Sequence, residues 1–260
     1  MDLPQEIIDE VIDNLVFDFG TLKSISLVRK SWTHRSRRRL FYFIQIDSLD
    51  RLEQWSTVIS ADPNGIASYP RAVTLLSPLK SWLEPKNLAR FYDHFRSFSR
   101  VERLTISGLG AAKFDATSTL RYFGNFAATL RSLELRTPVG TPALLLSFIC
   151  AFPLVDDLAI GFPNPTAAGG NQGEVTLPAS VPSFKGGLRL LDMFDESDPI
   201  IELLCALPLR FHTISVSSRE TQGLPQLSRL VGKCGKTVRS LHITRRTSGM
   251  AFAHISTPSW

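Results

Sequence analysis

Cysteine is scarce in this sequence and is placed where it cannot build a covalent framework. The three cysteines, Cys150, Cys205 and Cys234, are far apart and odd in number, which disfavours both a disulfide scaffold and a metal knuckle. The one Asn-x-Ser/Thr triplet, at residues 164–166, has a central proline that blocks glycosylation. These absences indicate a reducing compartment, and we expect the protein in the cytoplasm, the nucleus or both.

Segments for export or membrane insertion are missing as well. The chain begins with acidic residues rather than with a basic and then apolar stretch. Its longest nearly apolar run, from Pro142 to Pro153, is too short to cross a bilayer, so we expect no membrane association. The composition, 43% hydrophobic and 20% charged, is that of a globular protein. The net charge of +5 does not by itself indicate nucleic-acid binding.

Motifs for catalysis and cofactor binding are lacking. Gly108 and Gly110 begin a nucleotide-binding fingerprint, but Lys113 stands where its third glycine belongs. The glycine-rich residues 169–173 are not followed by a helix signal, the histidines show no metal-ligand spacing, and no Gly-x-Ser-x-Gly elbow occurs. We therefore expect no cofactor, no metal and no enzymatic activity, although a triad assembled from distant residues stays open.

The first forty residues have the periodicity of short helices. Apolar residues recur on one helical face, and acidic residues occupy the opposite face. The apolar set is Leu3, Ile7, Ile8, Val11, Ile12 and Leu15. Pro4 suits a first helical turn, and residues 17–20 interrupt the pattern. Thr21 is the expected cap of a second helix, and a third helix is expected from about Ser31 to Phe41.

Charge is segregated along this segment. Six acidic residues and no basic ones lie between Asp2 and Asp18, whereas seven basic residues and no acidic ones lie between Lys23 and Arg39. Three helices in about forty residues bury too little apolar surface to be stable alone. The segment is therefore predicted to be a docking module that needs a second polypeptide or a neighbouring domain.

Several motifs in this segment occur together in a fixed order. They are Leu3-Pro4-Gln5-Glu6-Ile7-Ile8, then Leu15, Leu22, the block Ser26-Leu27-Val28-Arg29-Lys30-Ser31-Trp32, and Ser36-Arg37-Arg38-Arg39-Leu40-Phe41. As a set they resemble the F-box, in the form common in fungal F-box proteins with leucine-rich repeats, over roughly residues 2–46. One departure is the link at Val16, Phe17 and Phe19, which is aromatic where an acidic and polar connection is expected.

The resemblance implies binding to a Skp-type adaptor, which connects F-box proteins to a cullin-based ubiquitin ligase. By matching position it implies that these residues form or support that interface: Leu3, Pro4, Ile7, Ile8, Ile12, Leu15, Leu27, Val28, Trp32 and Leu40. The alternative is that they only pack against the body of the same chain, because an amphipathic stripe is commonly core. Both interpretations stay open for Ile12 and Val28, whereas docking is favoured for Leu3 and Pro4.

The basic run Arg35, Arg37, Arg38 and Arg39 permits three interpretations. It is a solvated helix face that complements the helix dipole, an import signal, or a phosphate contact. We favour the first, because the F-box resemblance already accounts for an arginine-rich third helix. Nucleic acid is therefore not the expected partner.

A short apolar pattern recurs through the rest of the chain: apolar, two residues, apolar, one residue, apolar. The triplets are Phe41/Ile44/Ile46, Pro70/Val73/Leu75, Val101/Leu104/Ile106, Leu130/Leu133/Leu135, Val155/Leu158/Ile160, Leu188/Leu191/Met193, Phe211/Ile214/Val216 and Val238/Leu241/Ile243. Their middle positions differ by 29, 31, 29, 25, 33, 23 and 27 residues. Helix-like stretches lie between them near residues 52–59, 88–95, 120–127, 144–152, 200–204 and 227–234. Strand and helix at this period are the signature of leucine-rich repeats.

Alternating strands and helices also fit a doubly wound sheet. The strands of such a sheet are continuously apolar, whereas residues 133–136 and 241–244 alternate and predict one exposed face. We therefore predict an α/β fold: a short three-helix F-box-like motif, residues 1–46, followed by an irregular leucine-rich-repeat-like solenoid, residues 47–260. The irregularity is expected because Leu109, Pro138, Pro163 and Glu196 replace the asparagine or cysteine of the repeat corner.

Two segments are expected to depart from the repeat. The widest spacing falls on residues 161–187, whose glycines and prolines indicate an inserted loop, a place for a binding contact or for tolerated change. The end of the chain, Thr247 to Trp260, lacks a clear capping helix. An exposed last repeat, a truncated product and a self-association edge are the alternatives there.

Residues between the apolar positions of the strands are expected to point outward, so the concave sheet face is the predicted target site. Its members are Glu102, Arg103, Thr105, Arg131, Glu134, Asp156, Asp157, Arg189, Asp192, His212, Arg239 and His242. The middle repeats are acidic there and the last is basic, so a target needs opposite charges in matching order.

The predicted function is substrate recognition for an SCF-type cullin ubiquitin ligase. The chain would bind a Skp-type adaptor through its first helices and an unknown target protein through the repeats, and it would be monomeric apart from these partners. The alternative is a protein- or nucleic-acid-binding repeat scaffold unconnected to ubiquitin.

Overall fold

The computed structural model describes residues 4–15, 18–62, 65–76, 85–107, 123–136, 142–161, 184–193, 198–218 and 224–245. The helices are α1 (Gln5–Asn14), α2 (Phe19–Val28), α3 (Lys30–Leu40), α4 (Leu49–Ala61), α6 (Pro85–Phe95), α8 (Pro142–Cys150), α9 (Asp198–Ala206) and α10 (Leu224–Cys234), with short 3₁₀ helices η1 (Ile66–Ser68) and η2 (Gly124–Phe126). The strands are β1 (Phe43–Ile46), β2 (Ala72–Leu75), β3 (Arg103–Ser107), β4 (Ser132–Arg136), β5 (Asp157–Gly161), β6 (Gly187–Met193), β7 (Thr213–Ser218) and β8 (Ser240–Arg245). This mixed composition confirms the predicted α/β class.

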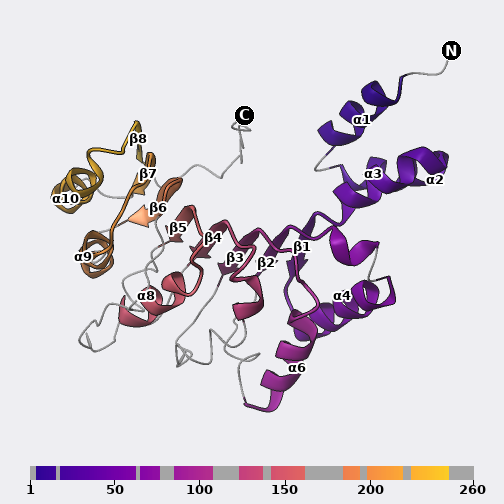
Figure 1. Ribbon diagram of the computed structural model, residues 1–260, viewed down its shortest axis with the longest axis horizontal. Helices are drawn as coiled ribbons and strands as arrows, with labels where there is room; N and C mark the ends of the chain where they lie inside the picture. The colour runs from indigo at the N-terminus through magenta and orange to yellow at the C-terminus, as the bar shows by residue number, and fades with distance from the viewer. Residues whose placement is uncertain are drawn as a thin grey trace.

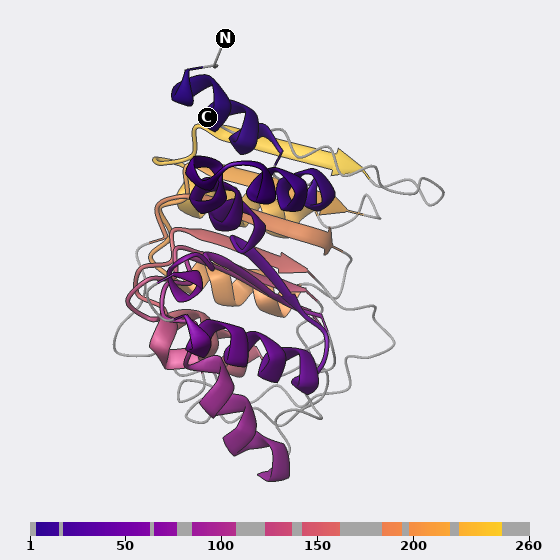
Figure 2. The ribbon, with the colours of Figure 1, turned by 90° about the vertical axis from the view of Figure 1, so that its right-hand side faces the viewer.

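The strands follow one another across a single sheet in the order in which they occur in the chain, and every neighbouring pair is parallel. Figure 1 shows α4, α6, α8, α9 and α10 along one side of this row of strands, and in Figure 2 the strands point the same way. A doubly wound sheet reverses its strand order at a switch point and carries helices on both faces. The sequential order therefore excludes the doubly wound alternative.

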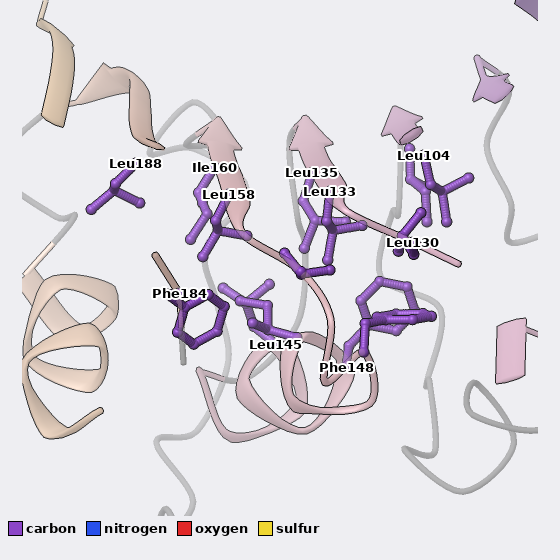
Figure 3. Close-up of a cluster of buried hydrophobic side chains, with 14 of the residues drawn as sticks. Leu104, Leu130, Leu133, Leu135, Leu145, Phe148, Leu158, Ile160, Phe184 and Leu188 are labelled. Carbon is purple, nitrogen blue, oxygen red and sulfur yellow. The ribbon is translucent and has the colours of Figure 1, made fainter. Parts of the chain in front are cut away.

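Two apolar rows run across the sheet on the side of these helices. One row is Ile44, Val73, Leu104, Leu133, Leu158, Leu188, Ile214 and Leu241, and the other is Ile46, Leu75, Ile106, Leu135, Ile160, Leu190, Val216 and Ile243. Both rows are buried from β1 to β7, and Figure 3 shows part of them facing Leu145 and Phe148 of α8. In the edge strand β8, Leu241 and Ile243 are exposed. The apolar triplets thus mark strands, as the sequence predicts.

The sixth triplet needs a correction. The apolar pattern centres it on Leu191, but Leu188 pairs with Leu158 of β5 and with Ile214 of β7. A register shift follows Leu190, and a bulge of this kind displaces later side chains from the regular alternation. The spacings from Leu158 to Leu188 and from Leu188 to Ile214 become 30 and 26 residues, so the period is more even than the sequence pattern suggests.

Phenylalanine rings join successive strand–helix units beneath the sheet. Phe95 of α6 lies with its centroid 5.2 Å from that of Phe123 and 4.9 Å from that of Phe126. Phe123 in turn lies 5.5 Å from Phe148 of α8. All four side chains are buried, and edge-to-face ring contacts of this kind add to the stability that burial alone provides.

Hydrogen bonds from threonine side chains to backbone carbonyl groups link neighbouring units at the turns that precede the strands. The Thr129 hydroxyl donates to the carbonyl oxygen of Val101 at 2.7 Å, and the Thr237 hydroxyl donates to that of Phe211 at 3.0 Å. Because a carbonyl without a partner is costly in a buried position, each threonine stabilises the turn that precedes its strand.

The expectation of one exposed sheet face is wrong for the central strands. Thr74, Thr105, Glu134 and Ala159 occupy the alternating positions of β2 to β5, and all four are buried. Each of them has a neighbouring strand on both sides at about 4.8 Å, so adjacent side chains shield it. Elsewhere the row is exposed, at Gln45 of β1, Arg189 of β6 and His242 of β8.

The predicted cap of the second helix needs correction. Asp18 caps α2, because its carboxylate accepts hydrogen bonds from the Thr21 backbone N–H at 2.9 Å and from the Thr21 hydroxyl at 2.6 Å; Thr21 itself is not the cap. Residues 120–122 of the stretch predicted near residues 120–127 lie outside the described residues; Phe123 is helical, and Gly124–Phe126 form η2. The sheet begins at Phe43, whereas the predicted division of the chain follows residue 46.

Some sequence predictions fall outside the described residues. They concern the repeat corners at Leu109, Pro138, Pro163 and Glu196, most of the inserted loop at residues 162–183, and the end of the chain at residues 246–260.

Candidate protein-binding surfaces

The first three helices enclose a small hydrophobic cluster of their own. Ile8 and Ile12 of α1 and Leu22 of α2 are buried in it. Leu15, Ile25, Trp32 and Leu40 pack against these three as partly buried side chains. The cluster is separate from the core beneath the sheet, so α1, α2 and α3 form a distinct packing unit, called here the helical unit.

Ion pairs fasten α1 to α3 within the helical unit. Arg35 Nη1 lies 2.8 Å from Asp9 Oδ2, and Arg39 Nε lies 2.8 Å from Asp13 Oδ1. Arg35 also donates to Asp13 through Nε and Nη2, at 3.1 and 2.5 Å. Hydrogen bonds from Arg39 and then Arg35 hold the pKa of Asp13 well below its ordinary value. The segregation of acidic and basic residues in the sequence therefore becomes a contact between two helices.

An apolar surface remains exposed on the helical unit. Pro4, Ile7 and Val11 lie one turn apart along α1 and share a face, and Ile7 and Val11 are 46% and 50% exposed. On α2, Leu27 is 86% and Val28 67% exposed. These five residues are called here the N-terminal apolar surface. Four of these five are large apolar side chains, exposed on a unit of three short helices, which makes them candidates for contact with a partner.

The residues that the F-box resemblance places at the adaptor interface fall into four groups. Pro4, Ile7, Leu27 and Val28 are exposed, Leu15, Trp32 and Leu40 are partly buried, Ile8 and Ile12 are buried, and Leu3 lies outside the described residues. Ile12, only 1% exposed, packs within the helical unit and not against the body of the chain. Ile8 and Ile12 therefore support the surface from behind without offering contact area.

Sequence reasoning missed two exposed apolar residues of the helical unit. Val11 was recognised as part of a broad apolar face but not as its outward edge, although it lies four residues after Ile7 and four before Leu15. Phe19, placed in the link between helices by the sequence pattern, is 41% exposed in the first turn of α2. The apolar face of α1 is wide, and this width could have revealed the exposed residues. Packing against the other two helices covers only one side of such a face.

Among the described residues, aromatic contacts at α3 and just after it connect the helical unit with the body of the protein. The Tyr69 hydroxyl, just before β2, is 3.0 Å from Nδ1 of His34 on α3. The rings of Phe41 and Trp55 lie edge to face at a centroid distance of 5.9 Å, which connects the end of α3 with α4. The helical unit is therefore anchored at its α3 side, and the N-terminal apolar surface is carried by α1 and α2.

The basic run divides in the structure. Arg35 and Arg39 are paired with aspartates of α1 as described above. Arg37 and Arg38 are exposed in the last turn of α3, where a cation is favourable with the helix dipole. The pairing of half the run with Asp9 and Asp13 weakens its interpretation as a phosphate contact.

Charged residues that directly precede the strands form ion pairs with one another at the amino-terminal ends of the strands. Arg71 Nη1 lies 3.2 Å from Glu102 Oε1, and Arg131 Nη1 lies 4.0 Å from Asp156 Oδ2. Backbone hydrogen bonds connect the same positions, because the carbonyl oxygen of Glu102 accepts from the N–H groups of Arg131 and Ser132. Three predicted target-binding residues therefore have a structural role at the amino-terminal ends of the strands: Glu102, Arg131 and Asp156.

The row of residues that alternates with the apolar rows is called here the polar face: Gln45, Thr74, Thr105, Glu134, Ala159, Arg189, Ser215 and His242. Glu134 points to this face, as predicted, but it is buried there, so little of its side chain is exposed to a target. Its Oε1 accepts from Arg136 Nε at 2.6 Å, and its Oε2 lies 3.5 Å from Arg189 Nη2. Of these three charged residues, Arg136 and Arg189 are exposed.

The other predicted target-binding residues are not brought together at one place. Asp157 accepts a hydrogen bond from the Gly187 N–H at 2.6 Å, which uses its carboxylate between β5 and β6. Arg103, His212, Arg239 and His242 are exposed on separate strands or strand ends, and the side chain of Asp192 lies outside the described residues. Asp156 and Asp157 lie at the start of β5 and His242 lies on β8, so the predicted order of an acidic middle and a basic end stays a prediction.

The chemistry of the described residues is otherwise sparse. Burial raises the pKa of the Cys150 thiol to about 11 and also raises the pKa values of Cys205 and Cys234, so these thiols are poor nucleophiles at neutral pH. Within the same residues, no group of three His, Cys, Asp or Glu side chains is arranged to hold a metal ion. Across that part of the chain, no helix has both the length and the apolar character that a bilayer crossing requires.

No protein-family model matches the sequence, and a search of curated proteins gives no significant match.

Proposed function

We propose that this chain is a substrate-recognition adaptor of an SCF-type cullin ubiquitin ligase. The helical unit would bind a Skp-type adaptor, and the sheet-bearing body would bind the target protein. The observation that carries the proposal is the N-terminal apolar surface. Its five residues remain exposed on α1 and α2 of a three-helix unit that is too small to be stable alone. The motif that resembles an F-box spans the same unit.

We further propose that the body is an irregular leucine-rich-repeat-like solenoid, and that it and the F-box-like helices are the two functional parts of the chain. Sequential parallel strands at spacings of 25 to 31 residues support this, since each strand and its connection then form one unit that contacts only its neighbours. Among the described strands β8 lies at the edge of the sheet, and its apolar residues Leu241 and Ile243 are exposed there. We place the protein in the cytoplasm, the nucleus or both, as a monomer apart from its partners.

The test is capture of a purified Skp-type adaptor by the full-length chain. The variant Ile7→Asp/Val11→Asp places two charges on the N-terminal apolar surface without touching the buried cluster of Ile8, Ile12 and Leu22. It should abolish capture, because an unpaired carboxylate in an apolar interface is strongly unfavourable. Val58→Asp is the matched control, since Val58 is 41% exposed on α4, in the body of the protein.

The result distinguishes three possibilities. Capture by the wild type and by Val58→Asp, together with its loss in Ile7→Asp/Val11→Asp, supports the proposal. Equal capture by all three proteins would place the adaptor elsewhere, and absence of capture by the folded wild type would contradict the adaptor function itself. Leu27→Asp provides an independent variant on α2, where Leu27 is almost fully exposed and its substitution leaves the packing unchanged.

The alternative is a scaffold that binds nucleic acid and has no link to ubiquitin. It rests on the exposed residues Arg37 and Arg38. Binding of this kind weakens steeply between low and physiological salt, because each phosphate contact releases counterions. A duplex-binding curve that does not change with salt, or with Arg37→Glu/Arg38→Glu, rules it out.

A further inference from the structure

The residues that directly precede the strands alternate in charge over the first part of the sheet. Before β2 and β3, Arg71 Nη1 lies 3.2 Å from Glu102 Oε1. Before β4 and β5, Arg131 Nη1 lies 4.0 Å from Asp156 Oδ2. Each cation of this series therefore has an anion on a neighbouring strand.

The pattern changes before β6, β7 and β8. The turns that lead into these strands, residues 184–186, 207–212 and 235–239, contain no aspartate or glutamate. Their basic residues are all exposed: Lys185, Arg210, His212, Lys236 and Arg239. Within the described part of the chain, none of these five side chains forms an ion pair. These three segments are called here the basic turns.

Backbone hydrogen bonds place the basic turns side by side. The His212 N–H donates to the carbonyl oxygen of Gly186 at 2.9 Å, and the Arg239 N–H donates to that of His212 at 2.7 Å. The Thr237 hydroxyl donates to the carbonyl oxygen of Phe211 at 3.0 Å. Since neighbouring strands lie about 4.8 Å apart, the positions before β6 and β8 are separated by about 10 Å. The five basic side chains therefore come from one compact part of the surface.

Two carboxylates border the basic turns on the side of β5, and both have other partners. Asp156 pairs with Arg131, and its backbone carbonyl accepts from the Gly186 N–H at 3.0 Å. Asp157 Oδ1 accepts from the Gly187 N–H at 2.6 Å. Neither of them forms an ion pair with a side chain of the basic turns.

The helix dipoles account for only part of this charge. The helix α9 ends at Ala206 and α10 ends at Cys234, and the attraction of a cation to a helix dipole fades beyond the last turn. Arg210 lies four residues after Ala206, and Arg239 lies five residues after Cys234. Adjacent cations without a partner repel one another, and an anionic ligand relieves that repulsion.

The size and composition of the basic turns favour a short acidic protein segment over nucleic acid. An extended segment advances about 3.3 Å per residue, so about three residues cover a width of about 10 Å. Single-stranded nucleic acid is bound through stacking of its bases on exposed aromatic rings, whereas Phe184 and Phe211, the phenylalanines of the basic turns, are buried. A duplex requires phosphate contacts over a longer surface.

We propose that the basic turns bind an acidic segment of a partner protein, through glutamate or aspartate side chains that contact Arg210, Arg239 and Lys185. The guanidinium groups suit carboxylates through two parallel hydrogen bonds, and the ammonium group adds a less directional charge. The basic turns precede the last strands of the row, whereas the helical unit precedes β1 (Figure 1). This surface is therefore separate from the proposed adaptor contact.

The experiment measures binding of a fluorescein-labelled decapeptide of glutamate to the full chain by fluorescence anisotropy. A lysine peptide, a peptide of alternating glycine and serine, and a short DNA duplex are the comparison probes. The wild type should bind the glutamate peptide most tightly, with an affinity that falls as salt rises, because exposed charges are screened. Arg210→Glu/Arg239→Glu should weaken this binding by about tenfold or more, since it replaces two attractions by repulsions.

Arg51→Glu/Arg96→Glu is the matched control for charge. Arg51 lies on α4 and Arg96 directly follows α6, and both are exposed. The two double variants change the net charge of the protein equally, so equal weakening of peptide binding in both would reveal a non-specific attraction and overturn the proposal. Lys236→Gln is a milder variant that should weaken binding by about twofold, and circular dichroism reports whether each variant is folded.

The remaining outcomes also decide the proposal. Absence of glutamate-peptide binding by the folded wild type contradicts it, as does tighter binding of the lysine peptide. Tighter binding of the duplex assigns the surface to phosphate instead. Capture of the Skp-type adaptor is measured on the same proteins and should be unchanged in Arg210→Glu/Arg239→Glu. Specific peptide binding without adaptor capture by the wild type supports this proposal and refutes the ubiquitin-ligase proposal.

Discussion

The hydroxyl of Tyr69 lies 3.0 Å from Nδ1 of His34, and the two rings meet edge to face at a centroid distance of 5.6 Å. Tyr69 is buried just before β2, and His34 belongs to α3. The pair therefore connects two packing units that have separate hydrophobic clusters. A contact of this kind fixes how the helical unit is held on the sheet and thus how the N-terminal apolar surface is presented.

Removal of this hydrogen bond should cost about 1 kcal/mol in the free energy of unfolding. Tyr69→Phe and His34→Phe each keep an aromatic ring and remove one partner of the bond. Urea unfolding of both single variants and of the double variant forms a double-mutant cycle. The two substitutions should be coupled, with the double variant losing less than the sum of the single losses; strictly additive losses would mean that the bond does not contribute.

The ion pairs between α1 and α3 predict a dependence on pH. The pKa of Asp13 is lower in the folded protein than in the unfolded chain, where it is about 3.9, because Arg39 and Arg35 donate hydrogen bonds to its carboxylate. The resulting stability is fully present above the unfolded pKa. It is lost as pH falls toward the lower folded pKa, so the relevant window runs from about pH 5 downward.

Asp13→Asn should therefore make unfolding less dependent on pH in this window. At pH 7 the variant should be less stable than the wild type by about 1 kcal/mol, since the pair is only partly buried, and the difference should shrink as the pH falls. Thermal unfolding followed by circular dichroism between pH 7 and pH 3 measures it. The exposed Asp93 of α6 is the control, and Asp93→Asn should follow the wild-type curve; a constant difference for Asp13→Asn would contradict the prediction.

The phenylalanine cluster beneath the sheet predicts a large difference between two substitutions of the same type. Phe95 is fully buried and contacts the rings of Phe91, Phe98, Phe123 and Phe126. Phe95→Ala should reduce the free energy of unfolding by about 3–5 kcal/mol, because it removes buried surface and leaves a cavity. Phe43→Ala on β1 should cost less than about 1 kcal/mol, since Phe43 is 43% exposed. Chemical denaturation checks both, and similar losses would show that the cluster is loosely packed.

The ion pairs of Glu134 predict a second difference in stability. Glu134→Gln removes the charge that Arg136 and Arg189 share and should cost about 1–2 kcal/mol. Glu202→Gln removes a comparable but exposed partner of Arg229 and should cost less than about 0.5 kcal/mol. Urea unfolding at neutral pH provides the comparison. Equal effects of the two substitutions would mean that burial of Glu134 adds nothing to its ion pairs.

The sequence pattern predicted the strands well, and its failures have physical causes. The triplets around Leu104, Leu133 and Ile214 predicted the observed strand pairing. In each strand, two alternate apolar residues are buried on the helix side of the sheet, and this spacing is visible in the sequence. The sixth triplet was displaced because β6 contains a register shift after Leu190, and three leucines in four residues fit the template in two ways. The cap of α2 was misplaced because Asp18 and Thr21 are both good capping residues, and only the backbone geometry selects Asp18.

The candidate surfaces were predicted less completely. The helical unit could be recognised from its periodicity, but periodicity cannot tell which side of a broad apolar face meets α3. Ile8 and Ile12 turned inward, and Ile7 and Val11 stayed exposed. On the polar face, the sequence identified Glu134 and Arg189 as outward-pointing residues but could not show that one is buried by the other, since they are 55 residues apart in the chain.

The sequence by itself determined the α/β composition, the strand positions and the separation of acidic and basic residues in the first helices, because these depend on local spacing and on the burial of apolar side chains. The tertiary structure decided the order of strands in the sheet, the side of α1 that remains exposed and the pairing of Glu134 with two arginines. Those features depend on contacts between residues far apart in the chain, and no local pattern specifies which charges and apolar faces will meet.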